Sequence, residues 1–279
     1  MAAISHFVSR LNFAFSMKVS SIRLFDKRVL ICYLPPMLPK LMHIPNQPER
    51  RYKLLDLFCS AGGTTYGYSH HFHVTGLDHR RFYRFPFPNN FIQADAIAFL
   101  SDPNNTIAFD CFAASPPCQR YSSSTSNRES WPDYIPIIRE LLNLTNKPYI
   151  IENVVGAPLI RSSAVELCGS MFGLDVERHR LFESNIPLFA PFCMHEWQLP
   201  RFKIRRHNKD YHSRVVHVYG AGGGKMGHDW NRAMEIDWMV KEELVDAIPP
   251  AYTKFLGAQM RAYLEHRELE FGNESDHSV

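Results

Sequence analysis

The sequence lacks the features that would place it in a membrane or among secreted disulfide scaffolds. No apolar run approaches the roughly 18–20 residues needed to span a bilayer. The six cysteines are scattered, and no two of them form a Cys-x-x-Cys pair. These absences predict that the chain is neither a membrane protein nor a dithiol redox protein, and they favour a reducing compartment such as the cytosol.

Acidic residues are scarce in two parts of the chain. Residues 1–50 hold seven Lys or Arg against two Asp or Glu, and residues 191–228 hold the same numbers, so each part carries +5. Because the whole chain carries only +3, the remaining residues carry −7. A basic segment on an acidic body indicates a surface that binds a polyanion such as nucleic acid.

Short apolar runs alternate with helical patterns from Tyr52 onward. Five runs are predicted to be strands: 52–58, 72–78, a run ending near Asp95, 109–114 and 147–156. Residues 135–142 have helical spacing, and so does the stretch 238–266. Strands that alternate with helices predict an α/β fold with a doubly wound, mostly parallel sheet.

The 279 residues are enough for one sizeable core and a smaller insert. The first fifty residues have the basic composition of a transit peptide, although Met17, Met37 and Met42 also allow a later start, which we prefer. The predicted divisions are a basic, poorly structured extension over 1–50, the main α/β domain over 51–184, an insert over 185–233, a return to the main domain over 234–270 and a disordered tail over 271–279.

A glycine turn and two acids follow the first predicted strands. In "DLFCSAGG" a strand runs into glycines that let the backbone approach a ligand, and the next helix offers its positive N-terminus. Asp78 ends the second strand, where an acid can hold ribose hydroxyls, and Asp95 follows the third, within reach of an adenine amino group. Either acid could instead be a loop residue or a helix N-cap.

Two prolines precede a cysteine in "SPPCQRYS", directly after the fourth strand. Pro116 and Pro117 restrict the backbone, so we expect Cys118 on a rigid loop at the carboxyl edge of the sheet. A thiol reacts as the thiolate, which a nearby cation such as Arg120 would favour. A small buried cysteine is the alternative.

Glu152 ends the fifth strand, in "IIENVVG". A carboxyl group among apolar neighbours can have a raised pKa and donate a proton, or it can simply cap a helix. Arg178 and Arg180 in "VERHRLFES" share one face if that stretch is extended, and paired arginines suit a phosphate or a base edge. Surface ion pairs are the alternative.

In this order, the motifs "DLFCSAGG", Asp78, Asp95, "SPPCQ", "ENV" and "RHR" resemble the signature of the DNA cytosine-5 methyltransferases, in particular compact phage and bacterial members. The resemblance covers about Tyr52–Ser184 and the C-terminal region. It implies a Rossmann-like methyltransferase fold in which Cys118 attacks C6 of a flipped cytosine. Glu152 would bind N3 and the exocyclic amine of the cytosine. Arg180 would hold the base, and Arg178 would support the loop that carries Arg180.

The resemblance also implies a cofactor and a partner. S-adenosylmethionine would be bound by Asp56, Phe58, Gly62, Gly63, Asp78 and Asp95. Double-stranded DNA would be contacted by Gln119, Ser122, Arg201, Arg205 and Arg206, because the insert lies where the family carries its target-recognition domain. The resemblance further implies a monomer without an obligatory protein partner, located in the cytoplasm of a bacterium or a phage-infected cell. It also implies a role in restriction-modification.

The sequence departs from the family pattern at two places. Val176 stands where the family has Gln, and "FLGAQM" stands where the family has Gly-Asn-Ser-Val. The insert contains Cys193, His195 and later histidines, but their spacing matches no closed zinc site, so no metal site is predicted.

Two other functions are compatible with the same motifs. An RNA methyltransferase that modifies tRNA shares this chemistry, but its Cys-Phe-Thr signature is absent. A catalytically inactive DNA-binding homologue is less compatible, because Cys118, Glu152 and both arginines are retained.

Overall fold

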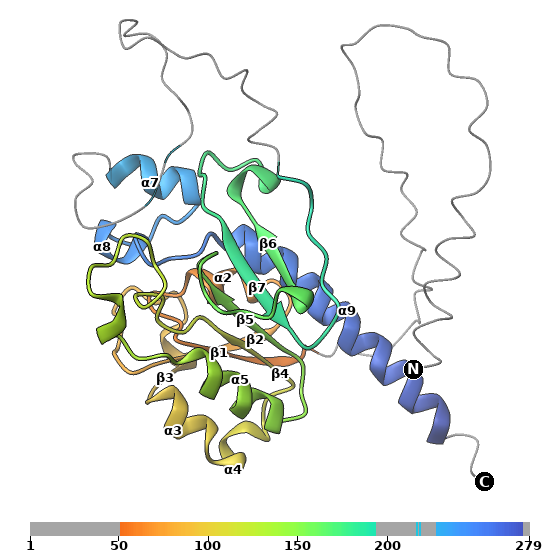
Figure 1. Cartoon of the computed structure of the whole chain (residues 1–279). Helices are drawn as coiled ribbons and strands as arrows, with labels where there is room; N and C mark the ends of the chain where they lie inside the picture. Colours follow the sequence, from red (N-terminus) through yellow and green to blue (C-terminus); the bar gives the residue numbers. More distant parts are fainter. Residues whose placement is uncertain (1–50, 194–215, 217, 219–226, 276–279) are drawn as a thin grey trace, which may run out of the picture. The chain divides into compact units, whose positions relative to one another are not determined.

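The protein is described by a computed structural model that covers residues 51–193, 216, 218 and 227–275. Within these residues seven strands form one sheet in the order β3-β2-β1-β4-β5-β7-β6 (Figure 1). The strands are β1 (Lys53–Leu57), β2 (His73–Asp78), β3 (Phe91–Gln93), β4 (Cys111–Ala114), β5 (Tyr149–Asn153), β6 (Ala164–Leu167) and β7 (Arg180–Ser184).

The first five strands confirm the predicted parallel sheet. Strands β1 to β5 pair in parallel, whereas β7 is antiparallel to both β5 and β6. The sequence analysis did not identify β6 or β7. Strand β6 is short and only partly buried, so it has little of the apolar signal that marked the others.

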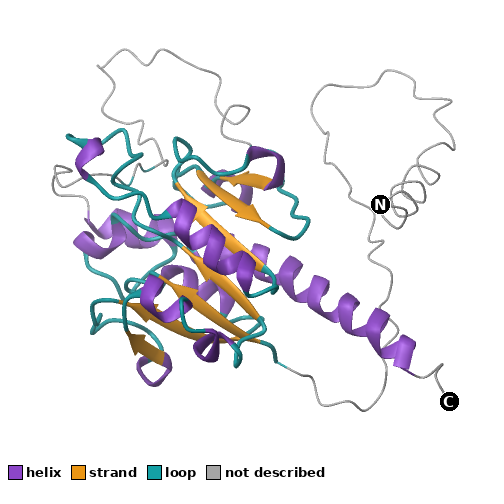
Figure 2. Ribbon diagram, turned by 60° about the horizontal axis from the view of Figure 1, so that its bottom comes forward, coloured by secondary structure: helices purple, strands orange, loops and turns teal. Residues whose placement is uncertain are grey.

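Helices cover both faces of the sheet (Figure 2). Side chains alternate between the two faces along a strand, so Leu54 packs on one side and Leu55 and Leu57 on the other. The Leu54 side is covered by α2 (Gly63–Tyr68), α7 (Gly227–Met234), α8 (Lys241–Leu244) and α9 (Pro250–Ser275). The Leu55 side is covered by α3 (Ala96–Leu100) and α5 (Ile135–Leu144), and α4 (Pro103–Thr106) packs beside α3.

The predicted segment boundaries can be compared with the helices only where the structure describes the chain. The 1–50 extension and most of the insert lie outside the described residues. Helix α7 begins at Gly227, inside the range assigned to the insert, and α9 continues to Ser275, inside the range assigned to the disordered tail. Across the described ranges no helix combines the length and the apolarity needed to cross a membrane.

A buried ion pair fastens α5 to β7. The Arg139 guanidinium donates to both carboxylate oxygens of Glu183, at 2.6 and 2.7 Å, and Glu183 is 1% exposed. We expect Arg139→Met to lower the free energy of unfolding by about 3–5 kcal/mol, because it leaves a buried charge without its partner. Urea denaturation measures this change.

The matched control is Arg261→Ala, which breaks the more exposed Arg261–Glu265 pair on α9. This substitution should cost about 0.5 kcal/mol or less. Equal effects of the two substitutions would contradict a special role for the buried pair.

Candidate active site

A cleft of about 500 Å³ opens at the carboxyl ends of the parallel strands. This is the edge at which open α/β sheets bind ligands. Nine of the residues singled out from the sequence line it: Phe58, Gly63, Asp78, Asp95, Cys118, Gln119, Glu152, Arg178 and Arg180. Residues from six separate parts of the chain therefore meet in one cavity.

The loop that carries Cys118 is held by backbone and side-chain hydrogen bonds. Ser115 N donates to Leu57 O, which extends the β4 to β1 pairing to the edge of the sheet. The buried Asn153 amide donates to Pro116 O at 2.9 Å. Asn153 follows Glu152, so the end of β5 fixes the proline–cysteine loop as well as supplying an acid. The proline–cysteine loop thus lies at the carboxyl edge of the sheet, held at Ser115 and Pro116.

The surroundings of Cys118 favour the neutral thiol. Burial raises the pKa of Cys118, the Glu152 carboxylate raises it further, and Arg180 and Arg178 oppose the rise. Arg120 was the predicted activating cation, but its guanidinium donates to the carbonyls of Glu129 and Trp131. Arg120 therefore holds the loop after Cys118, and the arginines that act on the thiol are Arg178, just before β7, and Arg180, its first residue.

Alkylation should report this environment. We expect the rate of iodoacetamide reaction at Cys118 in the free protein to rise with pH through a midpoint above the usual thiol value of about 8.5. Glu152→Gln should lower that midpoint, because it removes a charge that raises the pKa of the thiol. Peptide mass spectrometry after timed labelling separates Cys118 from the other cysteines. A midpoint below the usual value would contradict this electrostatic description.

The side chains of Glu152 and Arg180 form an ion pair between the neighbouring strands β5 and β7. Glu152 lies opposite Phe182 in the antiparallel β5–β7 pair, and its Oε1 is 3.3 Å from Arg180 Nε. Burial raises the pKa of Glu152, while Arg180, Arg178 and a hydrogen bond from Ser115 work against that rise. A buried carboxyl with a raised pKa can hold a proton and donate it inside the cleft.

Arg178 is a buried connector as well as a cleft residue. Its guanidinium donates to Val218 O at 2.7 Å and to Val245 O at 2.6 Å, while its own carbonyl accepts from the Tyr252 hydroxyl. Burial lowers the pKa of Arg178 to about 9. Arg178 therefore joins the start of β7 to the C-terminal part of the chain.

The glycine turn after β1 requires an unusual backbone. Phe58, Ser60 and Gly62 all have positive φ, of 60°, 47° and 87°. A Cβ at Gly62 would lie 2.7 Å from the Pro86 ring, so the residue shapes the turn without lining the cleft. A Cβ at Gly63 would lie 2.7 Å from Ile248 O, so only a residue without a side chain lets the segment before α9 pack this closely.

The two acids at the other strand ends have backbone partners. Asp78 accepts from Ser60 N and Arg80 N, both at 3.1 Å, and pairs with His79. Asp95 accepts from Ala98 N at 2.8 Å as the N-cap of α3, the alternative that the sequence left open. Both acids also line the cleft, so capping and ligand contact are compatible.

Asp56 lies beneath the turn and does not line the cleft. It is fully buried and accepts from the hydroxyls of Thr64 and Thr65, at 2.8 and 2.6 Å. Burial raises its pKa to about 7 despite these hydrogen bonds. The structure therefore shows Asp56 anchoring the start of α2, where the sequence analysis had predicted contact with a cofactor.

Only two of the five residues that were predicted to contact nucleic acid lie in the described part of the chain. Gln119 lines the cleft, and its Oε1 is buried with no hydrogen-bond partner in the described part of the chain. Ser122 lies outside the cleft lining, and its hydroxyl accepts from Ser124 N. Arg201, Arg205 and Arg206 fall outside the described residues.

Several cleft residues were missed by the sequence analysis. Trp131 and Tyr134 come from the segment after the cysteine loop, and the Tyr134 ring is 6.3 Å from the Phe58 ring. Asp246 comes from the C-terminal region, and burial raises its pKa. The "FLGAQM" stretch instead lies inside α9, where Gly257 packs against Tyr68. The part of the C-terminal region that reaches the cleft is thus 239–248.

Comparisons with known proteins agree with this fold. No family model and no curated protein sequence matches the chain. Among solved structures, S. pombe Dnmt2 methyltransferase is 11% identical with a TM-score of 0.51, over 77% of this chain and 99% of that chain. The seven-stranded sheet with flanking helices is thus the fold of that methyltransferase.

A second similar structure is a candidate DNA modification methyltransferase encoded within an E. coli prophage. It is 20% identical with a TM-score of 0.39, over 50% of this chain and 51% of that chain. The chain therefore matches about half the length of that protein.

Proposed function

We propose that the protein is an S-adenosylmethionine-dependent DNA cytosine-5 methyltransferase that acts through a covalent Cys118 adduct. The observation that carries this proposal is the meeting of Cys118, Glu152 and Arg180 in the same cleft as the glycine turn, Asp78 and Asp95. One end of the cleft holds a nucleophile beside an acid, and the other end has the features of a nucleotide-binding site. This arrangement suits the transfer of a group between two bound molecules.

The residues at the β1, β2 and β3 ends fit the cofactor. Acids at Asp78 and Asp95 offer acceptors for ribose hydroxyls and an amino group, and the aromatic rings of Phe58 and Tyr134 offer apolar contact. S-adenosylmethionine would supply the methyl group at this end of the cleft.

The chain's own residues perform the activation of the base. The Cys118 thiol loses its proton to solvent, and the sulfur adds to C6 of cytosine while the electrons of the C5–C6 double bond move toward C5 and the N3 side of the ring. The Glu152 carboxyl donates its proton to N3, which stabilises the charge that develops. After C5 gains the methyl group, C5 loses its proton to a solvent base and N3 returns its proton to Glu152, and the sulfur leaves as the thiolate when the C5–C6 double bond forms again.

The rigid loop and the buried polar network prepare this step. Asn153 holds Pro116, and Arg180 holds the carboxyl of Glu152, so the thiol and the acid are fixed before the base enters. The buried Oε1 of Gln119 has no hydrogen-bond partner among the described residues, so it offers an acceptor beside Cys118 for the nucleic acid around the extruded base.

Double-stranded DNA is the proposed partner, bound without an obligatory protein partner. The decisive test is transfer of a tritiated methyl group from S-adenosylmethionine to duplex DNA, with tRNA in parallel. Label on C5 of cytosine in DNA, located by bisulfite sequencing, is the expected result. Label on tRNA alone would show that the protein is an RNA methyltransferase and not a DNA methyltransferase. Label on neither nucleic acid would support the catalytically inactive DNA-binding homologue.

The basic insert makes a separate prediction about how DNA is held. Seven Lys or Arg lie between Arg201 and Lys225. If four or five of them contact phosphate, the log–log slope of affinity against salt should be about −4. Charge reversal by Arg205→Glu with Arg206→Glu should flatten the slope and weaken binding to all duplexes similarly.

Filter binding over a salt series measures this slope, and calorimetric binding of S-adenosylmethionine is the control. Cofactor affinity should not change, because the cofactor residues belong to the sheet. An unchanged slope in the double variant would show that the basic run is only a solvated segment.

A further inference from the structure

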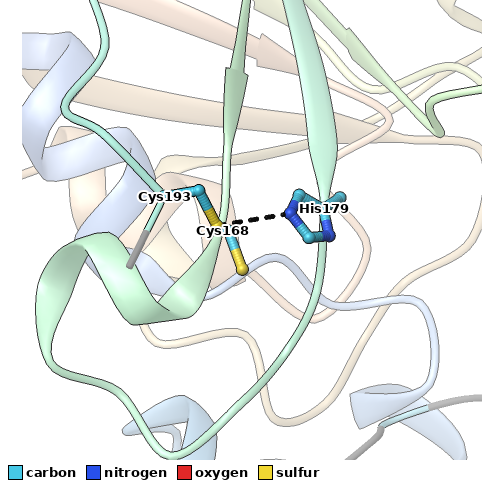
Figure 3. Close-up of side chains that lie close together, drawn as sticks. All are labelled: Cys168, His179 and Cys193. Atoms are coloured by element: carbon cyan, nitrogen blue, oxygen red, sulfur yellow. Dashed lines mark hydrogen bonds between the residues drawn. The ribbon is translucent and has the colours of Figure 1, made fainter. Parts of the chain in front are cut away.

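Two cysteines and a histidine gather on the side of the β6–β7 hairpin away from the cleft arginines. Cys168 follows β6, His179 directly precedes β7, and Cys193 lies in the segment after β7 (Figure 3). Because neighbours in an extended segment point to opposite faces, His179 points away from the side on which Arg178 and Arg180 reach the cleft.

The three side chains present their ligand atoms to one another. The sulfurs of Cys168 and Cys193 and a ring nitrogen of His179 all lie within 4.8 Å of one another. The Cys193 sulfur is 3.5 Å from His179 Nε2, and the Ser170 hydroxyl is 3.4 Å from the same sulfur. Cys168 is fully buried, whereas His179 and Cys193 are half-buried.

One of these separations already matches a tetrahedral zinc site, and the other two lie within 4.8 Å. Zinc–sulfur bonds of about 2.3 Å and zinc–nitrogen bonds of about 2.05 Å place sulfur and nitrogen about 3.5 Å apart, and two sulfurs about 3.8 Å apart. The distance between Cys193 Sγ and His179 Nε2 already has this value. The cluster could therefore close around an ion with small side-chain rotations.

We propose that Cys168, His179 and Cys193 bind a zinc ion. Two thiolates and one imidazole are the donor set that zinc prefers, whereas magnesium and calcium prefer oxygen. Three protein ligands leave a fourth position, and the Glu166 carboxylate, 3.9 Å from His179 Nε2, is within reach of it. The sequence analysis had grouped Cys193 with later histidines and predicted no metal site.

The position of the cluster indicates what the ion would do. His179 lies between Arg178, which joins three parts of the chain, and Arg180, which pairs with Glu152. Cys193 directly precedes the segment 194–215, which belongs to the basic insert. A bound ion would hold the segment around Cys193, where the chain enters the insert, against the start of β7 near the cleft arginines. This positioning role is independent of the proposed methyl transfer.

The metal content of the full chain tests the site. The chain is expressed without an affinity tag, kept in a non-thiol reductant and analysed by mass spectrometry of the elements. We expect about one zinc ion per chain, and a loss of most of it in Cys168→Ser and in Cys193→Ser. Cys111→Ala is the matched control, because Cys111 is buried in β4 outside the cluster. Its metal content should equal that of the unchanged chain.

A spectroscopic measurement keeps the test decisive if a variant folds poorly. Added Co²⁺ should give the sulfur-to-cobalt charge-transfer absorption and the visible bands of a tetrahedral site, and Zn²⁺ should abolish both. Absence of zinc after incubation of the reduced chain with Zn²⁺, together with no cobalt spectrum, would overturn the proposal. Zinc retained in full by both cysteine variants would also overturn it.

Discussion

Cys118→Ser is expected to reduce methyl transfer by a factor on the order of 10³ or more, because a hydroxyl is a far weaker nucleophile than a thiolate toward C6. The same change should abolish the covalent adduct with duplex DNA that carries 5-fluorocytosine, since fluorine at C5 blocks the final elimination. Denaturing gel electrophoresis with labelled DNA measures the adduct. The fold should survive, because the Cys118 side chain is only half-buried.

Cys111→Ala is the control for this experiment, because it removes a buried thiol that lies outside the cleft. It should form the adduct at the rate of the unchanged chain. An adduct that persists in Cys118→Ser would show that another cysteine is the nucleophile. Binding of S-adenosylmethionine should be similar in all three proteins, which separates loss of chemistry from loss of fold.

Glu152→Gln is expected to lower kcat by a factor of about 10²–10⁴ with little change in KM for DNA. Glutamine can still donate to N3 and accept from the exocyclic amine, but it cannot transfer a proton to N3. Burial raises the pKa of Glu152, so the unchanged carboxyl can carry that proton. Single-turnover methyl transfer at saturating DNA measures the chemical step directly.

The pH profile gives a second readout for Glu152. In the unchanged chain, kcat should fall at high pH when the Glu152 proton is lost, and the raised pKa places this fall above the usual carboxyl range. The fall should be absent in Glu152→Gln, because glutamine does not titrate. An unchanged kcat in the variant would show that the reaction does not use this proton.

Much of the site was readable from the sequence because its signals are local. Three of the four residues 54–57 are leucine and all four are buried, so a strand buried on both faces at that position follows from the residues themselves. Pro116 and Pro117 restrict the backbone whatever surrounds them, which is why the rigid cysteine loop could be predicted. Parallel strands end at one edge of a sheet, so Asp78, Asp95, Cys118 and Glu152 were expected together and line one cleft.

Contacts between distant parts of the chain were decided only by the tertiary structure. The direction of Arg120 away from Cys118, the burial of Asp56 under Thr64 and Thr65, and the arrival of Asp246 in the cleft have no local sequence signal. Cys168 and His179 likewise meet only because β6 and β7 form an antiparallel hairpin, and Cys193 joins them after β7. Residue spacing along the chain sets which face of a strand a side chain occupies, whereas strand pairing sets which side chains meet across it.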